Sequence, residues 1–237
     1  MMYSYFETMR RFRFSLFLVS LFVFLIVYPL LHYKFQGQIA IVEFIFMLLA
    51  MTGLNLLMHT KKALKIAAFL SVCIFFEILF SGYTNNQMLL SITIITELCF
   101  FVIIFISILN YVYAQQTIKI NKLLAIVTSY LVLGILFALI YTLIFTFAPS
   151  SFQYTIGNGL SELKQFPHPR FFSEALYFSF VTLSTLGYGD WVPIFGALKM
   201  LSALEAIIGQ LFIAMLIARL VGIHISQSVA KRGERHD

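Results

Sequence analysis

The sequence predicts an all-α membrane protein with six transmembrane helices and one shorter, re-entrant helix that is followed by a loop. Three observations lead to this fold class: the composition, the lengths of the apolar stretches and the distribution of basic residues. Of the 237 residues, 61% are hydrophobic and only 11% are charged, whereas a soluble domain has about 25% charged residues. So few charges cannot cover a soluble surface, and lipid must therefore be the solvent for much of the chain.

The apolar stretches predict how often the chain crosses the bilayer. A helix needs roughly 20 apolar residues to cross the hydrocarbon core. Six stretches reach this length, at residues 14–33, 38–58, 64–83, 87–113, 123–147 and 197–221. A seventh apolar piece, at 173–184, has only about 12 residues and would extend about 18 Å as a helix. Because it is too short to cross, we expect a half-helix that enters the membrane and is buried by protein.

The basic residues predict the orientation, because cytoplasmic loops of membrane proteins are enriched in Lys and Arg. With both termini in the cytoplasm, that side receives Arg10, Arg11, Arg13, Lys61, Lys62, Lys65, Lys119, Lys122, Arg219, Lys231, Arg232 and Arg235. The other side receives only Lys34, Lys164, Arg170 and Lys199. We therefore expect a multi-pass protein with cytoplasmic termini, and no nucleic-acid partner despite the net charge of +6. The lack of targeting signals and of sequons on the outside loops favours a bacterial inner membrane.

Several other classes of protein are not expected. By this topology residues 148–172 form an outside loop, and its Pro and Gly residues are typical of loops: Pro149, Gly157, Gly159, Pro167 and Pro169. Cys73 and Cys99 lie in apolar stretches without the spacing of a metal site. The five His residues are scattered, and the sequence has no catalytic constellation. Neither an enzyme nor an organic cofactor is therefore predicted.

One motif follows the half-helix directly: Thr182-Leu183-Ser184-Thr185-Leu186-Gly187-Tyr188-Gly189-Asp190. With the outer helix, outside loop, half-helix and inner helix in that order, residues 123–221 resemble the pore of the tetrameric six-transmembrane potassium channels. In that family such a loop is the selectivity filter, in which backbone carbonyls replace the water around a potassium ion. Gly187 and Gly189 can adopt the positive φ that aligned carbonyls require. The negative C-terminal dipole of the half-helix also favours a cation nearby.

The resemblance implies a role for each part of the chain. The filter would be Thr185, Leu186, Gly187, Tyr188 and Gly189, with permeant K⁺ as its ligand, supported by Tyr177, Thr182, Ser184 and Asp190. One filter strand per chain cannot close a pore, so a homotetramer in the lipid bilayer is implied. Residues 1–122 would be a four-helix domain that resembles a sensor domain, 123–222 the pore domain and 223–237 a short cytoplasmic tail. The basic residues of that tail would contact anionic lipid headgroups.

The sequence departs from the common pattern of that family at the filter. Leu186 replaces the usual Val, and we expect its bulk to lie behind the filter against Val181 or its neighbours. Val192 stands where some relatives have an aromatic residue that confers block by external quaternary ammonium ions. Because Val offers no cation–π attraction, we expect weak external block.

A second departure concerns the half-helix, on which the family often has two Trp residues that brace the filter. Here these positions are Tyr177 and Phe178. Tyr177 keeps a hydroxyl donor that can reach Asp190, whereas Phe178 has no donor for Tyr188. We therefore expect a filter with fewer braces.

The inner helix offers a candidate hinge and a candidate gate. Gly209 occupies the position of the family's frequent hinge glycine, and the alternative is close packing against a neighbouring helix. Ile213, Ile217 and Val221 recur at helical spacing and would either line the inner pore as a gate or pack against lipid or a neighbour. Glu205 lies one turn before Gly209, where it would bond the half-helix or outer helix, or line the cavity.

The first four helices lack the charges of a voltage sensor. The stretch 87–113 contains no Lys or Arg and only one acid, Glu97, so ordinary voltage gating is not expected. Glu43, Glu77 and Glu97 lie in three different apolar stretches. They would form an acid cluster that binds a proton or a cation, or else would be separate carboxyls held by hydroxyl and amide groups.

The leading interpretation is a passive potassium conductance that is not gated by voltage. Two alternatives stay open on the sequence. One is a weakly selective cation channel, and the other is a non-conducting regulatory or structural subunit that assembles with other channel subunits.

Overall fold

The computed structural model describes residues 2–34, 39–58, 60–81, 87–114, 120–156, 159–162 and 168–233. The long helices are α1 (Met2–Lys34), α2 (Ile39–Leu57), α3 (Lys61–Ser81), α4 (Gln87–Ala114), α5 (Ile120–Phe147) and α7 (Gly196–Gly233). A shorter helix, α6 (His168–Leu183), precedes α7. Each predicted apolar stretch thus coincides with a helix, although the predicted boundaries at 38 and 83 lie outside the described residues.

Four of these helices are long and apolar enough to cross a membrane, judged over the described residues alone. The four segments are Arg13–Leu30, Gln87–Ala114, Ile120–Phe147 and Gly196–Arg219. In α2 the described apolar part, Ile45–Leu57, is shorter. The structure therefore supports an integral membrane protein built mainly of helices.

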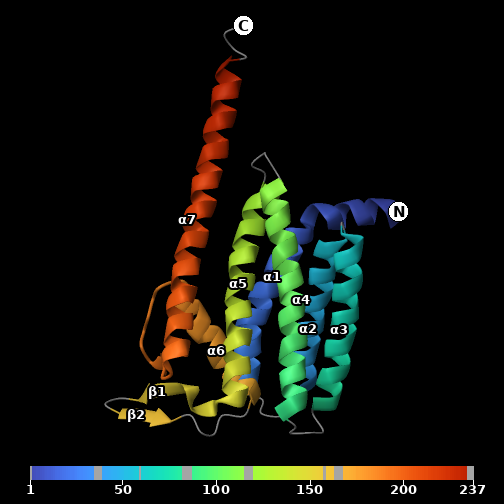
Figure 1. The fold of residues 1–237 in the computed structure, drawn as a ribbon. Coiled ribbons are helices and arrows are strands. Elements are labelled where there is room, and N and C mark those ends of the chain that lie inside the picture. Colours follow the sequence, from blue (N-terminus) through green and yellow to red (C-terminus); the bar gives the residue numbers. More distant parts are fainter. Residues whose placement is uncertain are drawn as a thin grey trace.

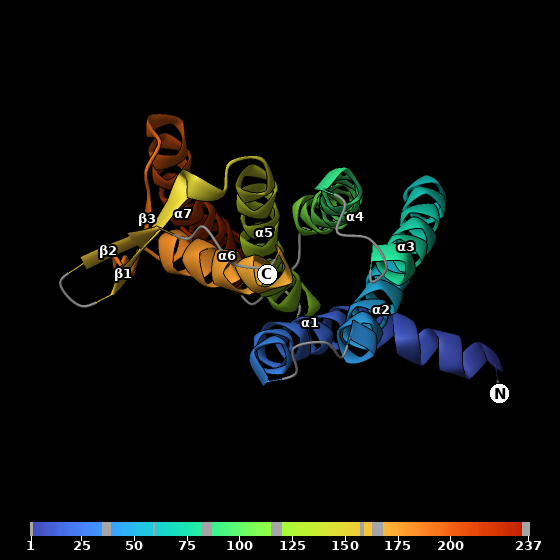
Figure 2. The ribbon, with the colours of Figure 1, turned by 90° about the horizontal axis from the view of Figure 1, so that it is seen from below.

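The helices form a side-by-side bundle that α7 extends at one edge. Figure 1 shows α1 to α5 standing next to one another, with α7 beyond α5 and the short α6 beside both of them. The start of α1 and the end of α7 lie at one end of the bundle, and the strands lie at the other. Seen from below, α6 lies against α5 and α7, far from α3 (Figure 2).

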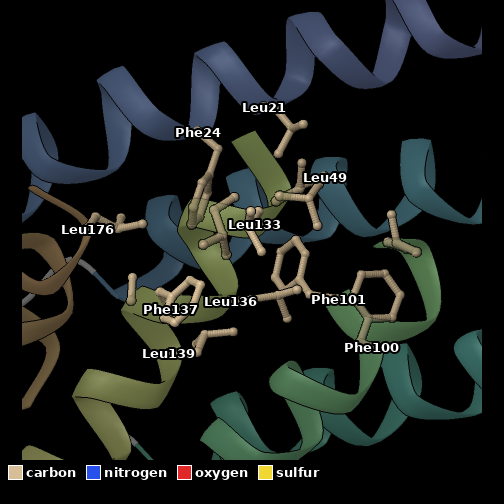
Figure 3. Close-up of a cluster of buried hydrophobic side chains, with 14 of the residues drawn as sticks. Leu21, Phe24, Leu49, Phe100, Phe101, Leu133, Leu136, Phe137, Leu139 and Leu176 are labelled. Carbon is tan, nitrogen blue, oxygen red and sulfur yellow. The ribbon is translucent and has the colours of Figure 1, made fainter. Parts of the chain in front are cut away.

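The hydrophobic core lies around α5, which is buried at every position from 132 to 139. Figure 3 shows that side chains from α1, α2, α4, α5 and α6 meet there, among them Leu21, Phe24, Leu49, Phe100, Phe101, Leu133, Leu136, Phe137, Leu139 and Leu176. In contrast, only 17% of the apolar segment of α7 is buried. The core thus fixes α5 and α6, and most of α7 is left to contact lipid or other chains.

A small antiparallel sheet lies in the predicted outside loop, and the sequence analysis did not predict it. It consists of β1 (Phe152–Ile156), β2 (Gly159–Glu162) and β3 (Trp191–Pro193) in the order β2-β1-β3. Ile156 pairs with Gly159, and Tyr154 pairs with Trp191. The aromatic and β-branched residues of β1 favour a strand. The predicted all-α class therefore holds for the membrane helices, with this sheet added at one end.

Several helices extend beyond the predicted stretches, most of all α1, α6 and α7. Helix α1 begins at Met2, where the apolar stretch was predicted from residue 14. Helix α6 begins at His168, where a half-helix was predicted from residue 173. Helix α7 continues to Gly233, so the predicted tail at 223–237 is a helical extension over most of its length. Near this extension Arg219 donates a 2.6 Å hydrogen bond to the carbonyl of Tyr113, and its guanidinium lies 4.5 Å from the centre of the Tyr113 ring. This contact ties α7 to the end of α4.

Candidate functional site

The end of α6 has an unusual conformation at Thr185. The amide of Thr185 donates to the carbonyl of Thr182 at 3.0 Å, and the amide of Leu186 donates to the carbonyl of Val181 at 2.9 Å. This pair of bonds is a Schellman motif, which places Thr185 in the left-handed position with φ +60°. Glycine normally occupies that position, because a β-branched residue is strained there. Since strain of this kind clusters at functional sites, it draws attention to the Thr185 side chain.

The segment after Thr185 continues with positive φ at alternate residues. Gly187 has φ +58° and Gly189 has φ +75°, whereas Leu186 and Tyr188 do not have positive φ. In an ordinary extended strand successive carbonyls point to opposite sides, and alternation of the sign of φ turns them toward one side. Residues 184–189 are all exposed. An exposed backbone of this kind can offer a row of carbonyl oxygens to a cation.

Asp190 anchors the far end of this segment. The hydroxyl of Tyr177 donates to Asp190 Oδ2 at 2.7 Å, which confirms the bond expected from the sequence, and the Trp191 amide donates to Oδ1 at 3.0 Å. The Trp191 ring is buried and packs against Phe152 and Phe171, with centroids 6.2 and 5.9 Å away. The role of Trp191 was not predicted from the sequence, although it is the single Trp of the chain.

The remaining support residues lie around the end of α6. Ser184 Oγ donates to the Phe180 carbonyl at 2.6 Å, and the half-buried Thr182 offers its carbonyl to Thr185 as described above. From α7, Gln210 Nε2 donates to Thr185 Oγ1 at 3.4 Å. The Leu186 side chain is 60% exposed in this single chain. Within the single chain it is therefore not buried behind the segment, and its expected place in the assembled filter stays a prediction.

Phe178 lies in an aromatic cluster. Its ring is 5.1 Å from Tyr141 and 5.2 Å from Phe152, both in edge-to-face geometry. Tyr188 stacks instead on Tyr177, at 6.4 Å. A larger ring at 178 would overpack the cluster. Phe178→Trp would thus change the packing of the cluster as well as any hydrogen bond to Tyr188. The expectation that the segment has fewer braces stays a prediction.

Glu205 is the fully buried acid of this region, with an exposed fraction of 0%. Its Oε2 accepts a 2.6 Å bond from the hydroxyl of Tyr141 on α5, and its Oε1 lies 2.5 Å from Ser179 Oγ on α6. The sequence left three alternatives for Glu205. The structure has bonds to both the half-helix and the outer helix, and the burial rules out a cavity-lining position in this chain. Tyr141 and Ser179 were not singled out from the sequence.

Gly209 allows α7 to approach the end of α6 closely. A Cβ atom built on Gly209 would lie 2.5 Å from the Leu183 carbonyl oxygen and 2.9 Å from Leu183 Cδ1. The same carbonyl oxygen accepts a 3.2 Å bond from the hydroxyl of Tyr130. Of the two alternatives, hinge or packing, this geometry favours packing.

The candidate gate residues lie on an uncovered face of α7. Ile213 is 37% exposed, Ile217 is 56% exposed and Val221 is 51% exposed, whereas Leu216 between them is buried. Each of these three side chains thus keeps a large exposed surface in the described chain. Both the gate and the packing alternatives therefore require contacts outside the single chain.

The predicted acid cluster is only partly described, because the side chain of Glu43 lies outside the described residues. Glu77 on α3 accepts a 3.3 Å bond from Thr96 Oγ1 on α4, one residue before Glu97. Among the described side chains, no three His, Cys, Asp or Glu residues come together to hold a metal ion. Thr96 Oγ1 also lies 2.8 Å from the Ile92 carbonyl oxygen, and Glu77 and Glu97 interact electrostatically, so both alternatives for these acids stay predictions.

The region that holds these residues is similar to a known protein family. Residues 130–224 match the model of a family described as ion channel. The matched range includes most of α5, the sheet, α6, the segment 185–189 and most of α7. No curated protein and no solved structure matches the chain. The family match supports an ion channel, a transport protein rather than an enzyme, and with the apolar helices it supports an integral membrane protein.

Proposed function

We propose that the chain is one subunit of a potassium-selective channel, a homotetramer that passes K⁺ passively through a filter formed by residues 185–189. The observation that carries this proposal is the conformation of the segment. A β-branched Thr185 is held at φ +60°, and Gly187 and Gly189 follow at positive φ, in an exposed backbone inside the ion-channel match.

The proposed mechanism uses backbone oxygens rather than charges. A potassium ion must exchange its water for other oxygens, and carbonyls supply these without binding the ion too tightly to leave. Thr185 Oγ1 adds an oxygen at the end of the row nearest to α7, where Gln210 reaches it. One chain supplies one strand of oxygens, so four copies are needed to surround the ion. The mostly exposed α7 supports such an assembly, because its uncovered face is available for neighbouring subunits.

The proposed topology has six spans with both termini in the cytoplasm. The distribution of Lys and Arg supports this, and so does the placement of the start of α1 and the end of α7 at the end of the bundle opposite the strands (Figure 1). In this orientation the strands and residues 185–189 face outward, and the basic end of α7 lies near anionic headgroups. We assign the protein to a bacterial inner membrane on composition. Opening would not follow voltage in the ordinary way, because α4 carries no Lys or Arg.

The test is ion flux from liposomes that contain the purified protein. We expect potassium flux that exceeds sodium flux, measured under opposing gradients of each ion. Equal fluxes of the two ions would favour the weakly selective cation channel and contradict potassium selectivity. No flux of either ion at any pH or voltage would favour the regulatory subunit. Protein-free liposomes and liposomes with the Gly187→Ala variant serve as controls.

Block from outside gives a second prediction, at Val192. This residue lies on β3 directly after the anchor at Trp191 and pairs with Gln153. An aromatic side chain at the mouth of the pore would attract a quaternary ammonium ion through cation–π contacts of about 0.5–2 kcal/mol. We expect external tetraethylammonium to block the wild type weakly, and Val192→Tyr to tighten the block roughly tenfold. The control is Val192→Leu, and block of the wild type at low concentration would contradict the prediction.

A further inference from the structure

We propose that Glu205 is a proton-binding site, at which a neutral carboxylic acid links α5, α6 and α7 behind the segment 185–189. The proton is the ligand, and Ser179 and Tyr141 complete the site. The inference goes beyond the proposed function, because it depends on the packing of three helices and does not depend on which ion passes.

The site is closed and polar. Glu205 is fully buried, as are Ser179 and Tyr141, each with an exposed fraction of 0%. Glu205 Oε1 lies 2.5 Å from Ser179 Oγ, and Oε2 lies 2.6 Å from the Tyr141 hydroxyl. Ser179 Oγ also lies 2.8 Å from the carbonyl oxygen of Gly134 on α5. Distances this short indicate hydrogen bonds at all three contacts.

Counting hydrogens assigns the proton. The Ser179 hydroxyl has one hydrogen but contacts two oxygens, Glu205 Oε1 and the Gly134 carbonyl. A carboxylate and a carbonyl are both acceptors only. If Glu205 were ionised, one of the two contacts would bring two lone pairs together at short distance. If Glu205 is protonated on Oε1, it donates to Ser179 and Ser179 donates to Gly134, while Tyr141 donates to Oε2. Each contact then has one hydrogen.

The surroundings supply no charge that would hold the ionised form. The titratable groups of α5 that act on the carboxyl are Tyr141 and Tyr130, both neutral donors. From α6 it meets the Ser179 hydroxyl, and on α7 Ser202 donates its hydrogen to the Leu198 carbonyl. Among its described partners there is no Lys, Arg or His. Burial of a carboxylate without a cation is strongly unfavourable, whereas burial of a fully bonded neutral acid is not.

Binding of this proton has a structural consequence. When Glu205 is neutral, Ser179 on α6 can donate its hydrogen to the Gly134 carbonyl on α5. The proton therefore stabilises the packing of α6 against α5, and the bonds of Glu205 hold α7 against both helices. Helix α6 ends at Leu183, two residues before Thr185, so its position sets the position of the segment 185–189. Loss of the proton at alkaline pH would turn the Ser179 hydrogen to the carboxylate and break the bond between Ser179 and Gly134. We therefore expect the helix packing, and any flux, to be sensitive to alkaline pH in the wild type.

The direct test is infrared spectroscopy of the full chain in lipid at neutral pH. The difference spectrum between the wild type and Glu205→Gln is expected to contain the carbonyl stretch of one protonated carboxylic acid. Glu97→Gln, which changes another acid on a membrane helix, provides the control background, and the same difference band should appear when Glu205→Gln is added to it. If Glu205→Gln instead removes a carboxylate band, the proposal is wrong. This readout does not require conduction, so it stands apart from any failure of the channel assignment.

Thermal unfolding of the purified protein gives a second readout. The Gln amide keeps a donor toward Ser179 and an acceptor toward Tyr141, although its second N–H hydrogen has no counterpart in the neutral acid. Glu205→Gln should therefore stay closer to the wild-type Tm at neutral pH than Glu205→Leu, and it should lose the dependence on alkaline pH. Glu205→Leu leaves Ser179 and Tyr141 without their partner and should lower the Tm at every pH. If Glu205→Gln were as unstable as Glu205→Leu at neutral pH, or kept the alkaline dependence of the wild type, the proton assignment would be overturned.

Discussion

Gly187→Ala is expected to abolish potassium flux while the purified protein still folds. Gly187 has φ +58°, and an added Cβ would meet no atom within 4 Å in the chain. The penalty therefore comes from the backbone, where a left-handed residue with a side chain costs roughly 1–2 kcal/mol. Relief of that strain turns the neighbouring peptide plane and takes its carbonyl out of the row. In a tetramer the change occurs in four strands at once.

The chain offers a matched control at the start of α7. An added Cβ on Gly196 would also meet nothing within 4 Å, but Gly196 does not have positive φ. Gly196→Ala should therefore keep the wild-type flux, since it adds the same methyl group without the strain. Flux from liposomes and the elution volume of the assembled protein are measured for both variants. Wild-type potassium selectivity in Gly187→Ala would show that residues 185–189 are not the filter.

The apolar helices could be predicted from the sequence because their signal is local. Each helix needs a long run of apolar residues, and such a run can be read without knowledge of the fold. The glycines at 187 and 189 were also predicted correctly to have positive φ, because glycine tolerates that conformation at little cost. The bond between Tyr177 and Asp190 was expected from resemblance and from the donor on Tyr177. In each case the residue type alone restricts what the backbone or side chain can do.

The parts that were missed depend on residues far apart in the chain. Tyr154 pairs with Trp191 in the sheet, and strands of three to five residues carry too weak a pattern to predict such pairing. The pair Gly157-Asn158 between β1 and β2 is typical of two-residue hairpins, and it was the one local signal available. Ser179 and Gly134 lie 45 residues apart and meet only because α5 and α6 pack together. The strain at Thr185 could not be predicted, because glycine is the usual residue at such a cap.

The second large effect is expected at Gly209, where α7 crosses the end of α6. Gly209→Ala would place its methyl carbon 2.5 Å from the Leu183 carbonyl oxygen, well inside contact distance. The oxygen belongs to the backbone and is already bonded to the Tyr130 hydroxyl, so it cannot move freely. Overpacking of this kind costs about 1–3 kcal/mol. We therefore expect a lower Tm, and lower flux because residues 185–189 follow the end of α6.

Gly222→Ala on the same helix separates packing from a hinge. An added Cβ on Gly222 would meet nothing within 4 Å, and Ala favours a helix over Gly by about 1 kcal/mol. Its Tm should equal or exceed that of the wild type. If Gly209 served as a hinge without a packing role, Gly209→Ala would likewise keep or raise the Tm and would change only the open probability. A Tm that falls in Gly209→Ala and not in Gly222→Ala would show that the close approach to Leu183, rather than flexibility of α7, requires glycine at 209.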